Sequence, residues 1–107
     1  MTHHPLTFLF TDLENSTPLW EQFPDEMRQA SARHDALMRA IIEQHHGRVV
    51  KTTGDGFHAV FEAPSDGVAA ALAGQQALTA EPWPNTTGPL KVRMGLHTGE
   101  SQERGGD

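Results

Sequence analysis

Alternating apolar and polar positions predict a β-strand near each end of the chain. The first, LTFLFT at 6–11, carries aromatic residues at alternate positions and ends at Asp12. A polar stretch, DLENST, then carries the chain past Pro18 and Pro24. The last strand, at 90–97, places one set of side chains on an apolar face and the other on a polar face. The apolar set is Leu90, Val92, Met94 and Leu96.

Two segments show the three- and four-residue spacing of amphipathic helices. From Asp25 onward, apolar residues recur at intervals of three, four and seven. Asp25 is the expected N-cap, and Gly47 lies where a left-handed C-terminal cap is expected. Ser65 is the expected cap of a second, alanine-rich helix that continues to about Ala80.

A β-hairpin is predicted between the two helices. The runs 48–53 and 57–62 flank Gly54-Asp55-Gly56, and Asp-Gly is a strong hairpin signal. The complete order of strand, helix, strand, strand, helix, strand is typical of an α+β, ferredoxin-like βαββαβ sandwich. In this fold both helices cover one face of an antiparallel sheet. Because the first two strands carry apolar residues on both faces, a dimer or a further segment is expected to cover the other face.

Composition limits the class of protein. A chain of 107 residues forms one small domain, and the absence of cysteine excludes disulfides and thiolate zinc sites. The net charge of -6 and the scattered basic residues argue against non-specific binding to nucleic acid or anionic membranes. The N-terminal segment lacks the features of a signal peptide or membrane span, so a cytoplasmic protein is expected.

Two aspartates are candidates for a metal site. If the end of the first strand lies beside the hairpin turn, Asp12 and Asp55 meet at one edge of the sheet. Paired carboxylates suit two hard cations, Mg²⁺ or Mn²⁺, and a two-metal clamp is a common way to promote displacement at phosphorus. Lys51 and Arg93 are candidate counter-charges for a polyphosphate.

Each of these residues also has a purely structural interpretation. Asp55 is consistent with an ordinary turn residue, and Asp12 with a helix cap. Lys51 and Arg93 are consistent with solvated side chains on polar strand faces. The residues considered one at a time therefore leave both interpretations open.

In combination the motifs are more specific. FLFTDLENST, HGRVVKTTGDGFHAVF and VRMGLHTGE, in this order, resemble the class III adenylate/guanylate cyclase catalytic domain from about Thr7 to the end. The resemblance implies a phosphorus–oxygen lyase, most simply an adenylate cyclase in cyclic-nucleotide signalling. In this reaction the ribose 3′-hydroxyl of ATP attacks the α-phosphate to give 3′,5′-cyclic AMP and pyrophosphate.

The resemblance also implies roles for the metal-binding residues. Asp12 and Asp55 match the aspartates that hold two Mg²⁺ or Mn²⁺ ions, and Leu13 matches a residue whose carbonyl can reach a metal. The turn that contacts the phosphates corresponds to the backbone at 13–17, including Asn15, Ser16 and Thr17.

The remaining matches concern the nucleotide. Lys51 matches the lysine that contacts the purine and favours adenine, and Arg93 matches the arginine that contacts the terminal phosphates. Asp107 matches the aspartate that cooperates with that lysine. In the family the lysine and the metal-binding aspartates of one chain serve different sites of a head-to-tail homodimer.

The chain departs from the family pattern at two places. Asn15 replaces a glycine, and asparagine is expected to preserve the left-handed loop. The family's Asn-x-x-x-Arg helix is missing from 1–107, so a single, C-terminally incomplete cyclase domain from a longer protein with regulatory domains is expected. Its metal sites are expected to be intact and its catalysis weak or absent.

Other functions remain open at this stage. The alternatives are an inactive cyclase-like module that binds nucleotide or dimerises, a guanylate cyclase, and an unrelated ferredoxin-like interaction domain that binds RNA. The acidic net charge argues against RNA binding.

Overall fold

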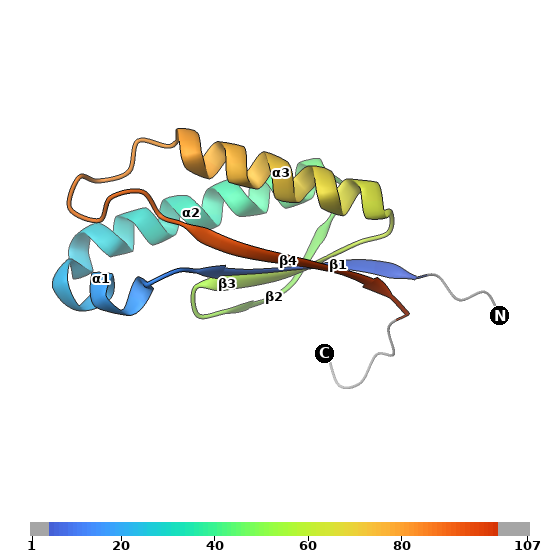
Figure 1. Ribbon diagram of the computed structural model, residues 1–107, viewed down its shortest axis with the longest axis horizontal. Helices are drawn as coiled ribbons and strands as arrows, with labels where there is room; N and C mark the ends of the chain where they lie inside the picture. The colour runs from blue at the N-terminus through green and yellow to red at the C-terminus, as the bar shows by residue number, and fades with distance from the viewer. Residues whose placement is uncertain (1–4, 101–107) are drawn as a thin grey trace.

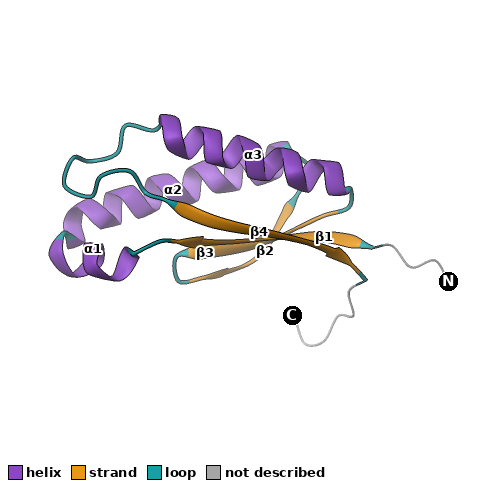
Figure 2. Cartoon of the chain, viewed as in Figure 1, coloured by secondary structure: helices purple, strands orange, loops and turns teal. Residues whose placement is uncertain are grey.

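A single antiparallel sheet, in the order β2-β3-β1-β4, organises the described part of the chain. The computed structural model describes residues 5–100. The strands are β1 Leu6–Leu13, β2 Arg48–Thr53, β3 Gly56–Phe61 and β4 Val92–Gly99. The helices are α1 Ser16–Gln22, α2 Pro24–Gln44 and α3 Pro64–Ala80. Helices α2 and α3 lie side by side over one face of the sheet, with α1 at the end of β1 (Figures 1 and 2). The predicted α+β sandwich is confirmed.

The core lies between this sheet face and the two long helices. Leu9 on β1 and Phe57 and Phe61 on β3 are almost completely buried, and Met38 and Ile42 pack against them from α2. These positions alternate along the strands and recur with helical spacing along α2, as the sequence pattern predicts.

The other face of the sheet is less buried. Phe8, Phe10 and Asp12 alternate with the buried residues of β1, and Phe10 is 41% exposed. Within residues 5–100 no helix covers this face (Figure 1). Its coverage by a dimer or a further segment stays a prediction.

Strand β1 is longer than predicted. It continues to Leu13 because β4 pairs with it to the end, with Asp12 opposite Arg93 and Leu13 opposite Val92. Aspartate disfavours strands, and the sequence pattern therefore ended the strand before Asp12. Pairing with β4 overrides that preference and holds the Asp12 backbone within the sheet.

The start of α2 differs from the prediction. Pro24 begins this helix, and Asp25 lies inside its first turn, where it forms an ion pair with Arg28. A proline is well suited to the first helical position because its φ angle is already helical and its missing N–H would have no partner there. The predicted Asp25 cap is therefore wrong.

Helix α1 was missing from the sequence-based assignment. It contains Pro18, but in its first turn, where a proline does not break the hydrogen-bonding pattern.

The end of α2 is a Schellman motif centred on His46. The N–H of Gly47 donates to the carbonyl of Ile42 at 2.8 Å, and that of His46 to Glu43 at 3.1 Å. His46, with φ of 66°, is the left-handed residue, so the predicted left-handed cap at Gly47 is wrong. Gly47 has a different role, because a Cβ atom there would lie 2.3 Å from the Phe61 ring.

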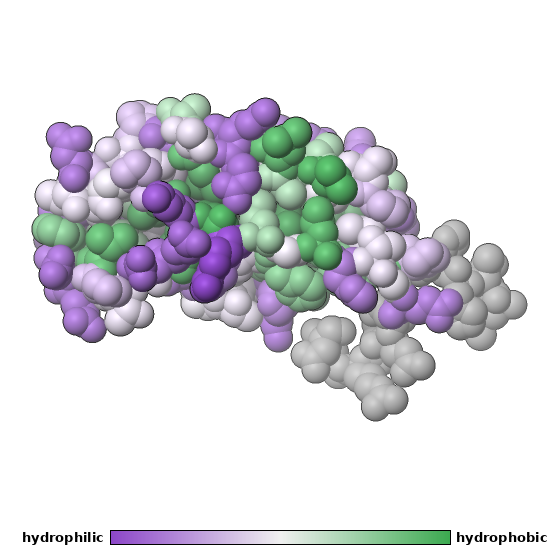
Figure 3. Space-filling view, in the orientation of Figure 1, coloured by the Kyte–Doolittle hydropathy of each residue, from purple (hydrophilic) through white to green (hydrophobic). Residues whose placement is uncertain are grey.

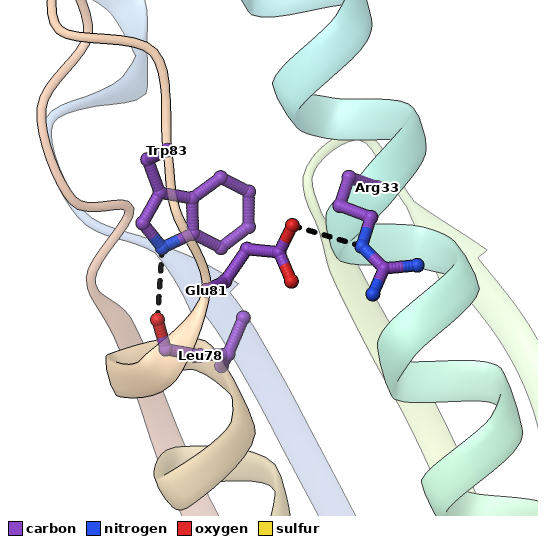
Figure 4. Close-up of polar contacts among 4 residues, drawn as sticks. All are labelled: Arg33, Leu78, Glu81 and Trp83. Carbon is purple, nitrogen blue, oxygen red and sulfur yellow. Dashed lines mark hydrogen bonds and ion pairs between the residues drawn. The ribbon is translucent and has the colours of Figure 1, made fainter.

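Helix α3 begins at Pro64, so the predicted Ser65 cap lies inside the helix. At the other end, two contacts position the connection to β4. The Trp83 indole N–H donates to the Leu78 carbonyl at 2.8 Å, and the Glu81 carboxylate accepts from Arg33 of α2 at 3.0 Å (Figure 4). These contacts join the end of α3 to α2 and guide the chain back toward β4.

Part of the apolar surface remains exposed. Val68 and Leu72 on α3 are 56% and 60% exposed, and apolar surface gathers over this helix in Figure 3. Across residues 5–100, no helix combines the length and apolar character that crossing a membrane requires.

The contact between Gly47 and Phe61 predicts a stability effect. We expect Gly47→Ala to lower the free energy of unfolding by about 1–3 kcal/mol, because the new methyl group must displace a buried ring. Urea denaturation measures the change. Gly95→Ala is the matched control, since a Cβ there meets no atom within 4 Å. Equal stability of the two variants would contradict the close contact.

Candidate functional site

The hairpin turn and the end of β1 lie at the same end of the sheet. Strand β1 pairs with β3 as far as Thr11 opposite Phe57, and β2 pairs with β3 as far as Thr53 opposite Gly56. Continued toward the turn, the β1–β3 register places Asp55 level with Leu13, one residue beyond Asp12. The structure therefore places the backbones of Asp12 and Asp55 at the same end of the sheet, as the topology argument requires.

The hairpin approaches β1 unusually closely. A Cβ atom on Gly56 would lie 2.2 Å from the Thr11 carbonyl oxygen, so only glycine fits there. Beside it, the buried N–H of Phe57 donates to the Thr11 hydroxyl at 3.0 Å. Gly54 has the left-handed φ of the turn, whereas Asp55 does not have a positive φ. These contacts fix the turn beside Asp12.

Asp12 already has a cationic partner. Arg93 lies directly opposite it on β4 and donates a hydrogen bond to Asp12 Oδ2. The two side chains are 55% and 65% exposed, so both remain accessible to a ligand from solvent.

A hollow of about 450 Å³ opens at this position on the face away from the helices. Asp12 and Arg93 supply charge to its lining, and Phe10 and His58 supply aromatic surface. The Phe10 and His58 rings meet edge to face, with centroids 4.7 Å apart. A hollow with one polar and one aromatic side can accommodate a ligand that is itself part charged and part planar.

Phe10 and His58 form the aromatic side of this hollow, and neither is among the site residues predicted from the sequence. Phe10 could have been found, because it lies two positions before Asp12 and alternation places both on the same sheet face. The contribution of His58 depends on the pairing of β1 with β3, which no local pattern specifies.

Lys51 lies on β2 next to this region. It is exposed and pairs with His58 across the β2–β3 ladder, after an irregularity between Val49 and Lys51. Because cross-strand partners share a face, Lys51 belongs to the face that carries the hollow.

Three of the remaining predicted residues lie within the described range, and one lies outside it. Asn15 has φ of 53° and ψ of 35°, the left-handed geometry expected of it, and precedes α1. Ser16 and Thr17 are the first residues of α1. Asp107 lies outside the described residues.

The donor set fits hard divalent cations. Among residues 5–100, no group of three or more His, Cys, Asp and Glu side chains is placed to hold a metal ion. Two carboxylates with nearby backbone carbonyls suit Mg²⁺ or Mn²⁺, which retain water and take further oxygen ligands from phosphates. Asp12, Asp55 and the Leu13 carbonyl are the groups that would hold such ions.

Comparison with known proteins identifies the family. The model of the adenylate and guanylate cyclase catalytic domain matches residues 1–104. The chain belongs to this family. An adenylate cyclase of Lachancea kluyveri is 36% identical over 112 residues, which cover 88% of this chain and 6% of the relative. An uncharacterized protein of Mycobacterium tuberculosis is 39% identical over 101 residues, which cover 92% of this chain and 33% of the relative.

Solved cyclase structures share the fold. An adenylate cyclase structure from Trypanosoma brucei, described as monomeric, superposes with a TM-score of 0.91 at 29% identity. The match covers 94% of this chain and 59% of that one. A guanylate cyclase domain from Catenaria anguillulae in complex with GTP has a TM-score of 0.78 at 22% identity, over 92% of this chain and 58% of that one, and shows the fold alone. The cyclase relatives thus include enzymes named for either purine nucleotide.

The link between Thr11 and Phe57 gives a test of how the turn is held. We expect Thr11→Val to reduce stability by about 1–3 kcal/mol, because the buried Phe57 N–H loses its acceptor. Hydrogen exchange should show lower protection of the Phe57 amide. Thr11→Ser retains the hydroxyl and should preserve that protection. Equal protection in the two variants would show that the hydroxyl does not hold the hairpin.

Proposed function

We propose that this chain is a cyclase domain that converts ATP to 3′,5′-cyclic AMP and pyrophosphate with two Mg²⁺ or Mn²⁺ ions. The main support is the convergence of Asp12 with the turn that carries Asp55, beside Arg93 and an open hollow. If Asp55 were only an ordinary turn residue, the close approach of the hairpin to the end of β1 would have no explanation.

In this mechanism the chain binds and orients the triphosphate. Asp12, Asp55 and the Leu13 carbonyl would hold the divalent ions, which when bound would polarise the 3′-hydroxyl and neutralise charge on the phosphates. Arg93 donates hydrogen bonds to the terminal phosphates, and the backbone at 13–17 contacts them. The 3′-hydroxyl gives its proton to solvent water and its oxygen bonds to the α-phosphorus. The bond between the α-phosphorus and the α,β-bridging oxygen breaks, and pyrophosphate leaves.

The preference for ATP rests on Lys51. It pairs with His58 on the sheet face that bears the hollow, and in the head-to-tail homodimer it would contact a purine whose phosphates lie at the metal site of the other chain. In this proposal Lys51 acts with Asp107 on adenine, and Asn15, Ser16 and Thr17 contact phosphate. A guanylate cyclase is the alternative.

The proposal includes a head-to-tail homodimer. Exposed aromatic surface on the face opposite the helices supports it, because Phe10 and its neighbours would be covered there. The chain spans 6% of the Lachancea kluyveri relative and 33% of the Mycobacterium tuberculosis relative. The proposal treats it as one cytoplasmic domain of a longer, regulated protein.

Metal binding provides the first test. We expect Asp12→Asn and Asp55→Asn each to abolish or strongly weaken Mn²⁺ binding, because each removes a carboxylate ligand. Isothermal titration calorimetry of the 107-residue chain measures this, with and without a non-cyclisable ATP analogue. A longer chain that includes the Asn-x-x-x-Arg helix is the material for the activity assay.

Glu43→Gln is the matched control for the metal test. It also removes one negative charge, but from an exposed position near the end of α2, away from the hairpin turn. Its Mn²⁺ affinity should equal that of the wild type. Retained binding in both aspartate variants would refute the metal assignment.

Base preference provides a second test. We expect Lys51→Glu to shift the ratio of affinities for ATP and GTP analogues toward GTP, because the side chain changes from donor to acceptor. Competition titrations in Mn²⁺ measure the ratio. Lys91→Glu makes the same charge change at an exposed residue just before β4 and should leave the ratio unchanged. An unaltered ratio in Lys51→Glu would argue against its contact with the purine.

A further inference from the structure

The most specific electrostatic contact at the site joins two of its own functional residues. Arg93 donates to Asp12 Oδ2, and the two residues are directly opposed partners in the β1–β4 ladder. Cross-strand partners on one face lie close enough for such a pair to form without distorting the backbone. The ion pair is therefore built into the register of the sheet.

This contact competes with metal binding. The Arg93 guanidinium is permanently charged, and it occupies a carboxylate oxygen that a divalent cation would need. A cation approaching Asp12 must displace Arg93 and also overcome its positive charge. Both groups are more than half exposed, so solvent weakens the pair and the competition amounts to roughly two- to fivefold in affinity.

A polyphosphate removes this competition. Phosphate oxygens offer Arg93 a bidentate partner, which a guanidinium fits well. Since Arg93 and Asp12 both line the hollow, a triphosphate entering with its metal ions can take Arg93 as the ions take Asp12. The same arginine thus opposes metal alone and favours metal together with nucleotide.

We propose that Arg93 is an internal counter-ion that holds Asp12 in the ligand-free chain and transfers to the phosphates when metal and nucleotide bind together. This inference rests on the proposed metal role of Asp12. Metal and nucleotide then bind cooperatively. The metal ions take Asp12 away from Arg93, which frees Arg93 for the phosphates, and the phosphates take Arg93 away from Asp12, which frees Asp12 for the metal.

The test compares two ligands on one variant. Arg93→Gln removes the counter-ion, and the residue is exposed, so circular dichroism should show an unchanged fold. By calorimetry at low ionic strength, we expect this variant to bind Mn²⁺ alone about two- to fivefold more tightly than the wild type. We expect it to bind the Mn²⁺ complex of a non-cyclisable ATP analogue roughly tenfold more weakly, since a charged hydrogen bond to phosphate is lost.

Lys91→Gln is the matched charge control. Lys91 is exposed on the same segment and lies outside the hollow, level with Glu14, whose N–H donates to the Lys91 carbonyl. Lys91→Gln should alter the affinity for Mn²⁺ alone and the affinity for the Mn²⁺ complex of the ATP analogue less than twofold. Arg93→Lys preserves the charge and should keep Mn²⁺ affinity near that of the wild type. The gain in Arg93→Gln should shrink as salt is raised, because screening weakens the ion pair.

The outcomes separate this inference from the proposed function. Unchanged or weaker Mn²⁺ binding in Arg93→Gln, with binding abolished in Asp12→Asn, would overturn the counter-ion role alone. Mn²⁺ binding that is unaffected by Asp12→Asn would overturn the metal role of Asp12, and with it this inference; if Asp55→Asn also left it unaffected, the metal assignment as a whole would fall. If Arg93→Gln binds Mn²⁺ alone more tightly and the Mn²⁺–nucleotide complex more weakly, the result would support both the counter-ion role and the metal assignment.

Discussion

The antiparallel register of β1 with its two neighbours is the constraint on which the site depends. Pairing with β4 sets Arg93 opposite Asp12, and pairing with β3 brings the hairpin turn level with the end of β1. Because side chains alternate along a strand, a shift of one residue would turn Asp12 toward the core and separate it from Arg93. The packing of Leu9 and Phe57 into the core opposes such a shift, so the hydrophobic pattern also positions the polar site.

Close backbone approaches support this arrangement. Gly56 allows the hairpin to contact the Thr11 carbonyl, and Gly47 allows the end of α2 to pass over the Phe61 ring. Neither glycine has the left-handed φ that usually requires glycine. In the hairpin turn Gly54 has the left-handed φ, and at the end of α2 His46 has it. Absence of a side chain, rather than backbone freedom, explains these two glycines. Each lies where two elements distant in sequence make contact.

The charged part of the site lies at the surface, on the sheet face that the helices leave uncovered. Asp12 and Arg93 are exposed there, and Phe10 and His58 form an aromatic wall beside them. An exposed ion pair contributes little to stability, so ligands can exchange its partners at small energetic cost. The helical side carries the packed core, whereas the open side carries the proposed metal site and the proposed dimer surface.

Local patterns in the sequence determined the order of the main elements and the cyclase motifs, because strand alternation and helical spacing survive without tertiary context. Tertiary structure decided what depends on pairing or packing between distant segments. Asp12 lies within β1 only because β4 pairs with it, and His58 joins the hollow only because β3 lies beside β1. Similarly, Asp25 and Ser65 resemble helix caps locally, but Pro24 and Pro64 begin the helices one residue earlier. Composition and spacing specify which face a residue occupies, whereas only the assembled sheet specifies its neighbours.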